Sequence, residues 1–405
     1  MQKNAKHLIL LISSFFFLAG CSFFSSETAV NIMKERPIFK PSYKPVIAWS
    51  KSIGGGIGKY YSQLKPAADS NAVYAASRDG EVSALSLKTG KTIWSVDLAN
   101  VVKHHFYSSA RFSGGIGQNS DCLFIGTENG QVLAINKKQG KLLWIADIKA
   151  EVIATPVYSD DMVIVHTKRG DLLSLNAKTG SENWSQHNKQ PQLSLRGSSI
   201  PTVAQGGIVY GRSDGFLCVA RLTTGQLLWE LPIARPHGAT ALDRLTDIDM
   251  KPVIVNNIIY ALAYNGNLAA IDLFKGKQLW SKPYSGFNNI VASGETLYIT
   301  DHRGYIYALD QTTGKKIWEN KQLSYRNVTS IAVANQYIVI GDGEGYLYWI
   351  NRDNGQFVAQ QKLDSDGLYI AALATEDYLY VQTRSGDLIA IEKPVLTQRK
   401  ALKDK

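Results

Sequence analysis

A repeat of about 44 residues runs through the chain and constrains its fold more than any other feature. The segment "DGEVSALSLKTGKTIW", residues 79–94, holds two glycines ten residues apart and a tryptophan four residues after the second glycine. Six copies keep all three positions, and they end at Trp94, Trp144, Trp184, Trp229, Trp280 and Trp318. A seventh copy has Ala359 in place of the tryptophan, and an eighth, from Ser385, stops after one predicted strand. This regularity predicts a repeat fold rather than two or three ordinary domains.

Each copy has room for four short strands. In the third copy, "ATPVYS" and "MVIVHT" precede the first glycine, and "LLSLNA" and the tryptophan segment follow it. Asp-Gly, Asn-Gly, Arg-Gly and Thr-Gly pairs between these runs suit tight hairpin turns, because glycine adopts positive φ at little cost. Four antiparallel strands every ~40–50 residues are typical of a β-propeller blade. The sequence therefore predicts an all-β, eight-bladed propeller of four-stranded antiparallel blades.

The two ends of the propeller are expected to pair. The eighth copy lacks its fourth strand, whereas "PVIAWSKSI", ahead of the first copy, offers a spare strand with Trp49. Such a strand would complete the last blade and leave no unprotected sheet edge. The predicted propeller spans residues 46–393, with the ring closed by this N-terminal strand, and a basic tail follows over 394–405.

The N-terminus has the pattern of a bacterial lipoprotein signal. Lys3 and Lys6 precede an apolar run over residues 8–19, which is too short for a comfortable membrane span. The run ends in "LAGC", which resembles the lipobox, where the signal is cut ahead of a cysteine that is then acylated. We expect a signal peptide over 1–20, lipidation at Cys21 and a tether over 21–45, with two or more acyl chains for stable anchoring. An ordinary signal peptide with an incidental cysteine is the alternative.

Composition gives weaker indications about partners and compartment. The formal net charge is +10, and removal of Lys3 and Lys6 with the signal leaves +8. The basic residues are spread along the chain, which favours a solvated surface facing anionic lipid headgroups over nucleic-acid binding. Cys122 and Cys218 each lie in an apolar strand-like run, so we expect buried thiols rather than a disulfide framework.

One repeat phrase admits an enzymatic reading. "ALDQTTGKKIW" resembles the repeat of pyrroloquinoline-quinone dehydrogenases, which commonly have adjacent cysteines near the quinone and carboxylate ligands for calcium. This chain has no Cys-Cys pair, no HExxH or GxSxG motif and no acidic cluster assignable to a metal. We therefore predict no catalytic residue, no metal and no cofactor. A propeller that binds cell-wall glycan or another small ligand is a further alternative, which exposed aromatic rings on one face would favour.

Over residues 46–392 the chain resembles the BamB family, the lipoprotein subunit of the outer-membrane β-barrel assembly machinery. The resemblance rests on segments in the same order, among them "GGGIGKYYSQLKPA", "LSLRG", "RPHGATALDRLTDID" and "GYLYWINRDNGQFVAQQK". It implies a non-enzymatic scaffold that faces the periplasm and binds the POTRA domains of the barrel-inserting subunit BamA. Binding of nascent outer-membrane proteins is left open. Ser22 after the lipidated cysteine, by resemblance to lipoprotein sorting rules, points to the outer membrane.

Two of these segments form the candidate docking site. "LSLRG" follows Trp184 and "RPHGATALDRLTDID" follows Trp229, so both are expected to be blade-to-blade connections on one face, ahead of strands beginning near residues 198 and 251. The resemblance ties them to BamA binding through five residues: Leu193, Leu195, Arg196, Asp247 and Asp249. An apolar tip with charged flanks suits a desolvated contact at an interface. The alternative is that the leucines fold back on the blade edge and Arg196 pairs with Asp247 or Asp249 for local stability.

Overall fold

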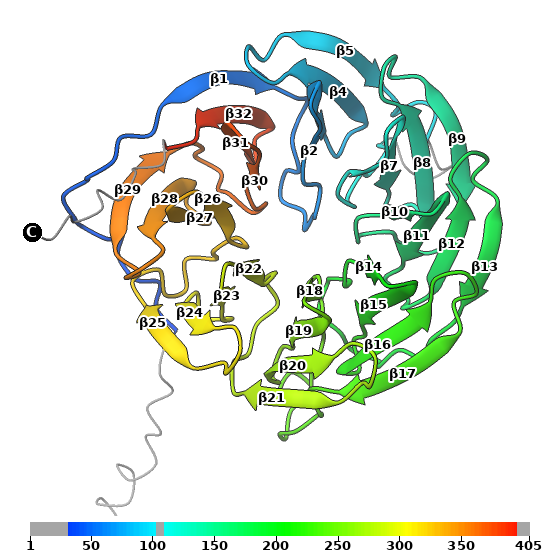
Figure 1. The fold of residues 1–405 in the computed structure, drawn as a ribbon. Coiled ribbons are helices and arrows are strands. Elements are labelled where there is room, and N and C mark those ends of the chain that lie inside the picture. The colour runs from blue at the N-terminus through cyan, green and yellow to red at the C-terminus, as the bar shows by residue number, and fades with distance from the viewer. Residues whose placement is uncertain (1–30, 103–108, 395–405) are drawn as a thin grey trace, which may run out of the picture. The chain divides into compact units, whose positions relative to one another are not determined.

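The computed structural model describes residues 31–102 and 109–394, and in these every regular element is a strand. From Lys34 onward the strands form eight four-stranded antiparallel sheets arranged around a central axis, as Figure 1 shows. The predicted all-β, eight-bladed propeller is confirmed. The signal peptide, Cys21 and residues 395–405 lie outside the described residues.

In blades one to seven, the four strands follow chain order from the axis outward (Figure 1). Blades one to three contain β2 (Ala67–Ala68), β3 (Ala72–Ala76), β4 (Glu81–Ser86), β5 (Thr92–Asp97), β6 (Gly117–Gln118), β7 (Cys122–Gly126), β8 (Gln131–Asn136), β9 (Leu142–Asp147), β10 (Val157–Ser159), β11 (Met162–His166), β12 (Leu172–Asn176) and β13 (Glu182–Gln186). Blades four and five contain β14 (Thr202–Ala204), β15 (Gly207–Gly211), β16 (Phe216–Arg221), β17 (Leu227–Pro232), β18 (Val253–Val255), β19 (Ile258–Leu262), β20 (Leu268–Asp272) and β21 (Gln278–Lys282). Blades six and seven contain β22 (Val291–Ser293), β23 (Thr296–Thr300), β24 (Ile306–Asp310), β25 (Lys316–Asn320), β26 (Ala332–Ala334), β27 (Tyr337–Gly341), β28 (Tyr346–Asn351) and β29 (Phe357–Lys362).

The eighth blade joins the two ends of the propeller. Its sheet has the order β1-β32-β31-β30, with β1 (Ile47–Ser52), β30 (Leu373–Ala374), β31 (Tyr378–Gln382) and β32 (Asp387–Glu392). Trp49 of β1 lies opposite Ala390 of β32. The predicted closure by an N-terminal strand is therefore confirmed.

The repeated tryptophans join neighbouring blades. A Cβ added to Gly140 would lie 2.5 Å from the ring of Trp94 in the preceding blade, and one added to Gly90 would lie 2.6 Å from Trp49. Since the indole ring occupies the space where a side chain would begin, glycine is required at the second position of the repeat. Indole nitrogens also donate to backbone carbonyls of the next blade, as Trp94 does to Lys137 (2.7 Å). The repeat thus encodes the contact between blades.

Tyr43 takes the place of the tryptophan that the seventh copy lacks. Its backbone nitrogen donates to the carbonyl of Val358 (3.2 Å), and its ring lies 6.0 Å from that of Trp349. Its hydroxyl donates to the carbonyl of Glu392 in the eighth blade (3.3 Å), as the indoles do elsewhere. Elsewhere the tryptophan of one blade packs on the second repeat glycine of the next blade. The eighth copy of the repeat lacks that glycine, so a tryptophan at position 359 would have no glycine to pack on. An aromatic side chain from the N-terminal segment therefore bridges the last two blades.

Residues 34–45, which the sequence assigns to the tether, lie against blades six and seven. The backbone nitrogen of Lys34 donates to the carbonyl of Ser324 (3.0 Å), and Phe39 stacks on Phe357 with ring centroids 5.5 Å apart. Figure 1 shows this segment in dark blue, passing from β1 along β29 towards β25. The contacts with the propeller therefore begin well ahead of residue 46.

The connections between blades and the turns between second and third strands share one face of the ring, and the Thr-Gly turns lie on the other. Among the described residues, Cys122 and Cys218 are free thiols, half-buried and buried respectively. The same residues contain no group of three or more His, Cys, Asp or Glu placed to hold a metal ion. No helix long and apolar enough to cross a membrane occurs among them.

Candidate docking site

The segment from Gln192 to Gly197, called the docking loop below, is a connection between blades and not a shortened strand. It has no strand geometry and lies between β13 and β14, and β14 begins at Thr202 rather than near residue 198. Leu193 is 46% exposed, and Leu195 is half-buried. The loop thus presents an apolar tip to solvent, as predicted, with one leucine outward and one partly enclosed.

Asp247 holds the docking loop from beneath. It is fully buried, and its Oδ1 accepts a hydrogen bond from the backbone nitrogen of Leu195 (2.9 Å). It comes from the next connection, between blades four and five, which ends where β18 begins at Val253 rather than near residue 251. The two sequence segments therefore meet, but through a buried side chain, whereas the sequence predicted Asp247 as a charged flank of the exposed tip.

Lys168 ties the other side of the docking loop, and sequence reasoning missed it. Its Nζ donates to Ser194 Oγ (2.8 Å), to the carbonyl of Leu195 and to the carbonyl of Gly197 (3.2 Å). Lys168 sits in the turn after β11 of the third blade, where a basic residue carries no distinctive pattern. Lys168 thus binds backbone carbonyls of the loop, and Asp247 binds a backbone N–H, so the two side chains together fix the loop backbone.

Asp249 packs against the end of the loop. A Cβ added to Gly197 would lie 2.0 Å from Asp249 Oδ2, so only glycine fits beside this carboxylate. Burial, together with the neighbouring Asp247 and against the effect of Lys168, raises the pKa of Asp249 to about 7. Burial also raises the pKa of Asp247 to about 6, against the effects of Lys168 and the Leu195 amide. The two carboxylates share one nearby cation, and Asp247 Oδ2 has no hydrogen-bond partner.

Arg196 does not pair with either aspartate. Its guanidinium lies 3.5 Å from Glu128 Oε2 and 3.4 Å from Glu151 Oε2, and its side chain is 47% exposed. Glu128 is itself nearly buried and pairs with Arg78 (2.8 Å). The alternative prediction, in which Arg196 pairs with Asp247 or Asp249, is therefore wrong: the partners are two glutamates. The two glutamates orient the Arg196 side chain, and nearly half of its surface stays exposed and available for other contacts.

Tyr61 joins the docking loop to the centre of the ring and was also missed. Its residue surface is 42% exposed, its hydroxyl accepts a hydrogen bond from Gln63 (2.9 Å), and partial loss of water around the phenol raises the pKa of the hydroxyl. Asp249 raises that pKa further and Arg196 opposes it, which places the phenol near both charged groups. The signal that could have found it is "KYYSQ", two adjacent tyrosines in a blade connection.

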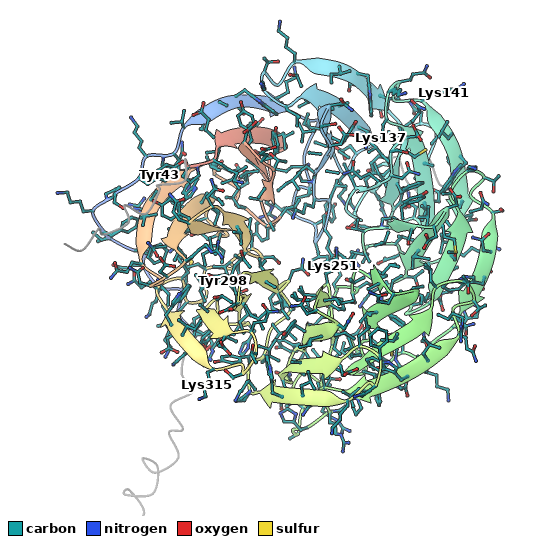
Figure 2. The ribbon with its side chains drawn as sticks, in the orientation of Figure 1. Tyr43, Lys137, Lys141, Lys251, Tyr298 and Lys315 are labelled. Atoms are coloured by element: carbon teal, nitrogen blue, oxygen red, sulfur yellow. The ribbon has the colours of Figure 1, made fainter. Side chains whose placement is uncertain are left out.

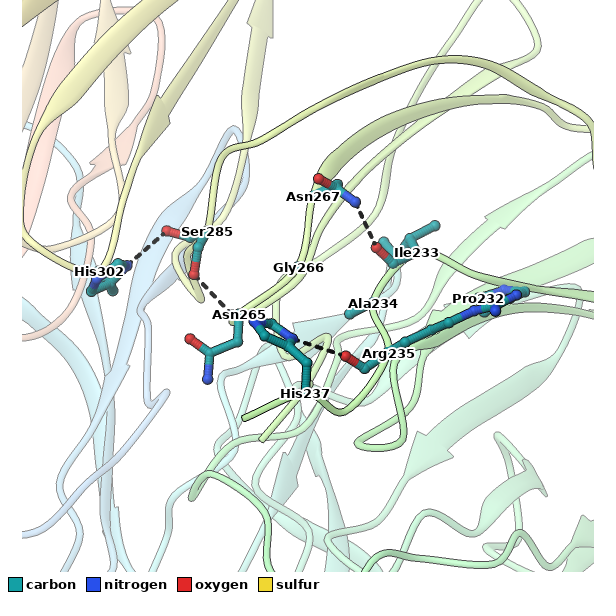
Figure 3. Close-up of a pocket in the computed structure, with 10 residues that line it drawn as sticks. All are labelled: Pro232, Ile233, Ala234, Arg235, His237, Asn265, Gly266, Asn267, Ser285 and His302. Carbon is teal, nitrogen blue, oxygen red and sulfur yellow. Dashed lines mark hydrogen bonds between the residues drawn. The ribbon is translucent and has the colours of Figure 1, made fainter. Parts of the chain in front are cut away.

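A separate pocket of about 560 Å³ opens on the same face (Figure 3). It lies between Pro232–His237 of the fourth connection and the turn holding Asn265, and His302 closes one side. The Nδ1 atoms of His237 and His302 lie 3.1 and 3.3 Å from backbone carbonyl oxygens, and Ser285 Oγ accepts from the Asn265 nitrogen (2.9 Å). No carboxylate lines the pocket, so it offers no oriented acid–base pair.

The fold is that of an eight-bladed β-propeller, and the docking loop is a connection on one face with an exposed leucine beside an arginine. The chain belongs to the family of the outer membrane protein assembly factor BamB, whose sequence profile matches residues 78–320. It is 46% identical over 388 residues to the outer membrane protein assembly factor BamB of Aliivibrio fischeri, covering 96% of this chain and 98% of the relative. The family is that of an assembly factor and not of an enzyme.

Solved structures agree on the architecture. The crystal structure of BamB from Moraxella catarrhalis superimposes with a TM-score of 0.76 at 24% identity, covering 86% of this chain and 100% of that one. A quinohemoprotein alcohol dehydrogenase from Comamonas testosteroni superimposes with a TM-score of 0.67 at 12% identity, covering 87% of this chain and 78% of that one. At these identities each likeness concerns the fold alone, which explains why the repeat phrase resembles quinoprotein dehydrogenases.

Proposed function

We propose that this chain is a scaffold of outer-membrane β-barrel assembly and that the docking loop binds the periplasmic POTRA domains of BamA. The observation that carries the proposal is the construction of the loop. Leu193 and Arg196 face outward, while Asp247 and Lys168 fix the backbone that carries them. A preformed loop loses little conformational freedom on binding, and this favours affinity.

The five predicted residues divide into two roles in this proposal. Leu193, Leu195 and Arg196 contact the partner, since each has exposed or half-exposed surface. Asp247 and Asp249 are positioning residues, because both are buried beneath the loop. This division explains how buried carboxylates can affect binding without touching the partner.

The test is binding of the full chain to the POTRA domains of BamA, measured by calorimetry. Leu193→Ala and Arg196→Ala should each weaken binding by about 1–3 kcal/mol, as central interface residues do. Leu279→Ala is the matched control, since Leu279 is 50% exposed on the outer strand β21. Equal losses of binding and of melting temperature in the loop variants would show that the loop is structural and that docking occurs elsewhere.

We further propose that acylated Cys21 anchors the chain to the outer membrane, with the propeller in the periplasm. The proposal is supported by the lipobox-like sequence and by membership of a family of outer membrane assembly factors. Signal peptide, tether, propeller and basic tail keep the predicted order in this proposal. Within the described part of the proposed tether, hydrogen bonds to the propeller are present at Lys34, whose backbone nitrogen donates to the carbonyl of Ser324.

A further inference from the structure

The N-terminal segment of residues 34–47, called the rim segment below, is fixed against the outer edge of the propeller. Arg326, whose side chain is only 1% exposed, donates from Nη1 to the backbone carbonyl of Lys34 (2.8 Å). Further along the segment, Phe39 and Tyr43 turn their rings towards the blades and stack on aromatic side chains there. The side chains between these contacts therefore point outward in a fixed arrangement, and little ordering is needed to present them to a partner.

Large apolar side chains are among those that point outward. Ile38 is 94% exposed, more than any other large apolar side chain that the structure describes, and Val46 and Ile47 are 48% and 42% exposed. Pro37 and Phe39, on either side of Ile38, are buried and half-buried. The neighbours of Ile38 thus hold the segment to the propeller while Ile38 itself stays in solvent. Exposed apolar groups on a rigid surface mark sites of interaction.

Most of the remaining outward side chains are basic. Between residues 34 and 51 the chain has one acidic residue, Glu35, and five basic ones: Lys34, Arg36, Lys40, Lys44 and Lys51. All six are exposed, and within the described part of the chain none of the five basic side chains forms an ion pair. Arg36 lies instead over the ring of Tyr346, 4.7 Å from its centroid. The positive charge of the rim segment is therefore not neutralised by the propeller and attracts an anionic surface.

The place of the rim segment in the chain indicates which anionic surface it meets. Cys21, the proposed site of acylation, precedes Lys34 by 13 residues. A chain of that length spans at most about 45 Å when fully extended, so an anchored chain keeps the rim segment within that distance of the bilayer. Phospholipid headgroups lie within this reach. An exposed apolar side chain among basic ones is typical of segments that lie at a bilayer interface.

We propose that the rim segment lies on the headgroup surface of the membrane, with Ile38 inserted between headgroups and the basic side chains bound to anionic phospholipid. The proposal rests on the lipid anchoring proposed above, which brings the chain to the bilayer and raises the effective concentration of this second, weaker contact. Blades six and seven then face the membrane. The docking loop, between β13 and β14, lies on the other side of the ring (Figure 1) and stays free for a protein partner.

The test uses the chain from residue 21 onward with Cys21→Ser, so that no acyl chain contributes, and measures its co-sedimentation with lipid vesicles at low salt. Binding to phosphatidylcholine vesicles that contain phosphatidylglycerol should be at least about tenfold tighter than binding to phosphatidylcholine alone. High salt should remove this difference, because it screens exposed charges.

Paired charge reversals locate the contact. Lys40→Glu combined with Lys44→Glu should weaken binding to the anionic vesicles at least about tenfold, since each basic residue near such a surface contributes a factor of about five. Lys138→Glu combined with Lys141→Glu changes the net charge equally, at exposed positions of a turn in blade two. Figure 2 shows Lys141 on the rim of the ring, well away from Tyr43. This control should weaken binding less than about threefold.

A second pair of variants tests the insertion of Ile38. Ile38→Ser should weaken binding to the anionic vesicles about three- to tenfold, because an apolar side chain is lost from the interface. Ile93→Ser, at a 55% exposed position of β5, is the matched control and should leave binding unchanged.

Three results would overturn the proposal: no preference for the anionic vesicles, equal losses in the two double lysine variants, or no effect of Ile38→Ser. Equal losses would assign the attraction to the overall charge of the chain and not to the rim segment. None of these results bears on acylation of Cys21, since the chain used here has no lipid. Failure of lipid anchoring would in turn leave the vesicle result unchanged, so the two proposals fail separately.

Discussion

The indole ring of Trp49 lies on Gly90, and its nitrogen donates to the carbonyl of Leu87 at 2.9 Å. Trp49 stands at the start of the propeller and Gly90 in its first blade, but the contact joins blade eight to blade one. The same contact recurs between other neighbouring blades. The contact that closes the ring between blades eight and one is therefore the same tryptophan–glycine contact that joins other neighbouring blades.

Replacing Trp49 with alanine should destabilise the propeller strongly. The side chain is only 9% exposed, so Trp49→Ala should lower the free energy of unfolding by about 3–5 kcal/mol. Urea denaturation followed by circular dichroism measures this loss. Ile47→Ala, at a 42% exposed position of the same strand, is the control and should change stability little. A loss below 1 kcal/mol in Trp49→Ala would mean that the strand is not needed for closure.

Tyr43 should contribute to stability although it lies ahead of the first strand. Tyr43→Ala removes a half-buried ring packed near Tyr337 and Trp349, and should cost about 1–3 kcal/mol. Lys44→Ala, at the exposed neighbouring position, should have no such effect in the same urea titration. If both variants match the unmodified chain, residues 34–45 are a tether in function despite their contacts.

The positioning role of Asp247 can be separated from its charge. Asp247→Asn keeps an oxygen acceptor for the Leu195 amide and should leave binding to BamA within about 0.5 kcal/mol of the unmodified value. Asp247→Ala leaves that amide without its buried acceptor, at a cost of about 1–3 kcal/mol. Hydrogen exchange at the Leu195 amide should accelerate in the alanine variant only. Loss of binding in both variants would assign the effect to the charge instead.

Asp249 should make the protein less stable as pH rises. Its pKa in the folded state, about 7, exceeds the value near 3.9 of an unfolded aspartate, so the folded state binds more protons between these values. The associated stability is present at low pH and lost as pH rises towards and through 7. Asp249→Asn should therefore be about 1–3 kcal/mol more stable than the unmodified chain at pH 8, and its gain in stability should be clearly smaller at pH 5, where only about a third of the effect has developed.

Urea denaturation at the two pH values measures this difference. Asp243→Asn changes an exposed carboxylate of the same connection and should give no gain at pH 8. A gain of equal size at pH 5 and pH 8 would show that the substitution improves packing, and that titration of Asp249 is not the cause.

Lipid anchoring through Cys21 is tested by fractionation. Cys21→Ala, placed behind a cleavable signal peptide, should give a soluble periplasmic protein, while the unmodified chain should stay with the outer membrane after a high-salt wash. A net charge of +8 alone gives a weak attraction that salt screens, whereas acyl chains resist salt. Retention of the variant in washed membranes would assign the anchoring to another contact.

The sequence by itself determined the blades and their number. Each blade is a local unit of consecutive strands, so its alternation, turn glycines and tryptophan all lie within about 44 residues and are visible as a repeat. Closure by the strand that contains Trp49 was predictable for the same reason, because one missing strand matched one spare strand. The docking loop could be placed on a face, since its position between two blades follows from the repeat.

Only the tertiary structure decided which side chains meet on that face. Arg196 pairs with Glu128 and Glu151, and Lys168 holds the loop, although no spacing in the sequence links these residues. The physical reason is that connections from all blades converge around one axis, so the neighbours come from positions 26 to 68 residues apart and their pairing depends on how far each side chain reaches. The position of Tyr43 could not be predicted either, because the segment that contains it has no sequence repeat. Only the folded propeller shows that its side chain fills the place of the missing tryptophan.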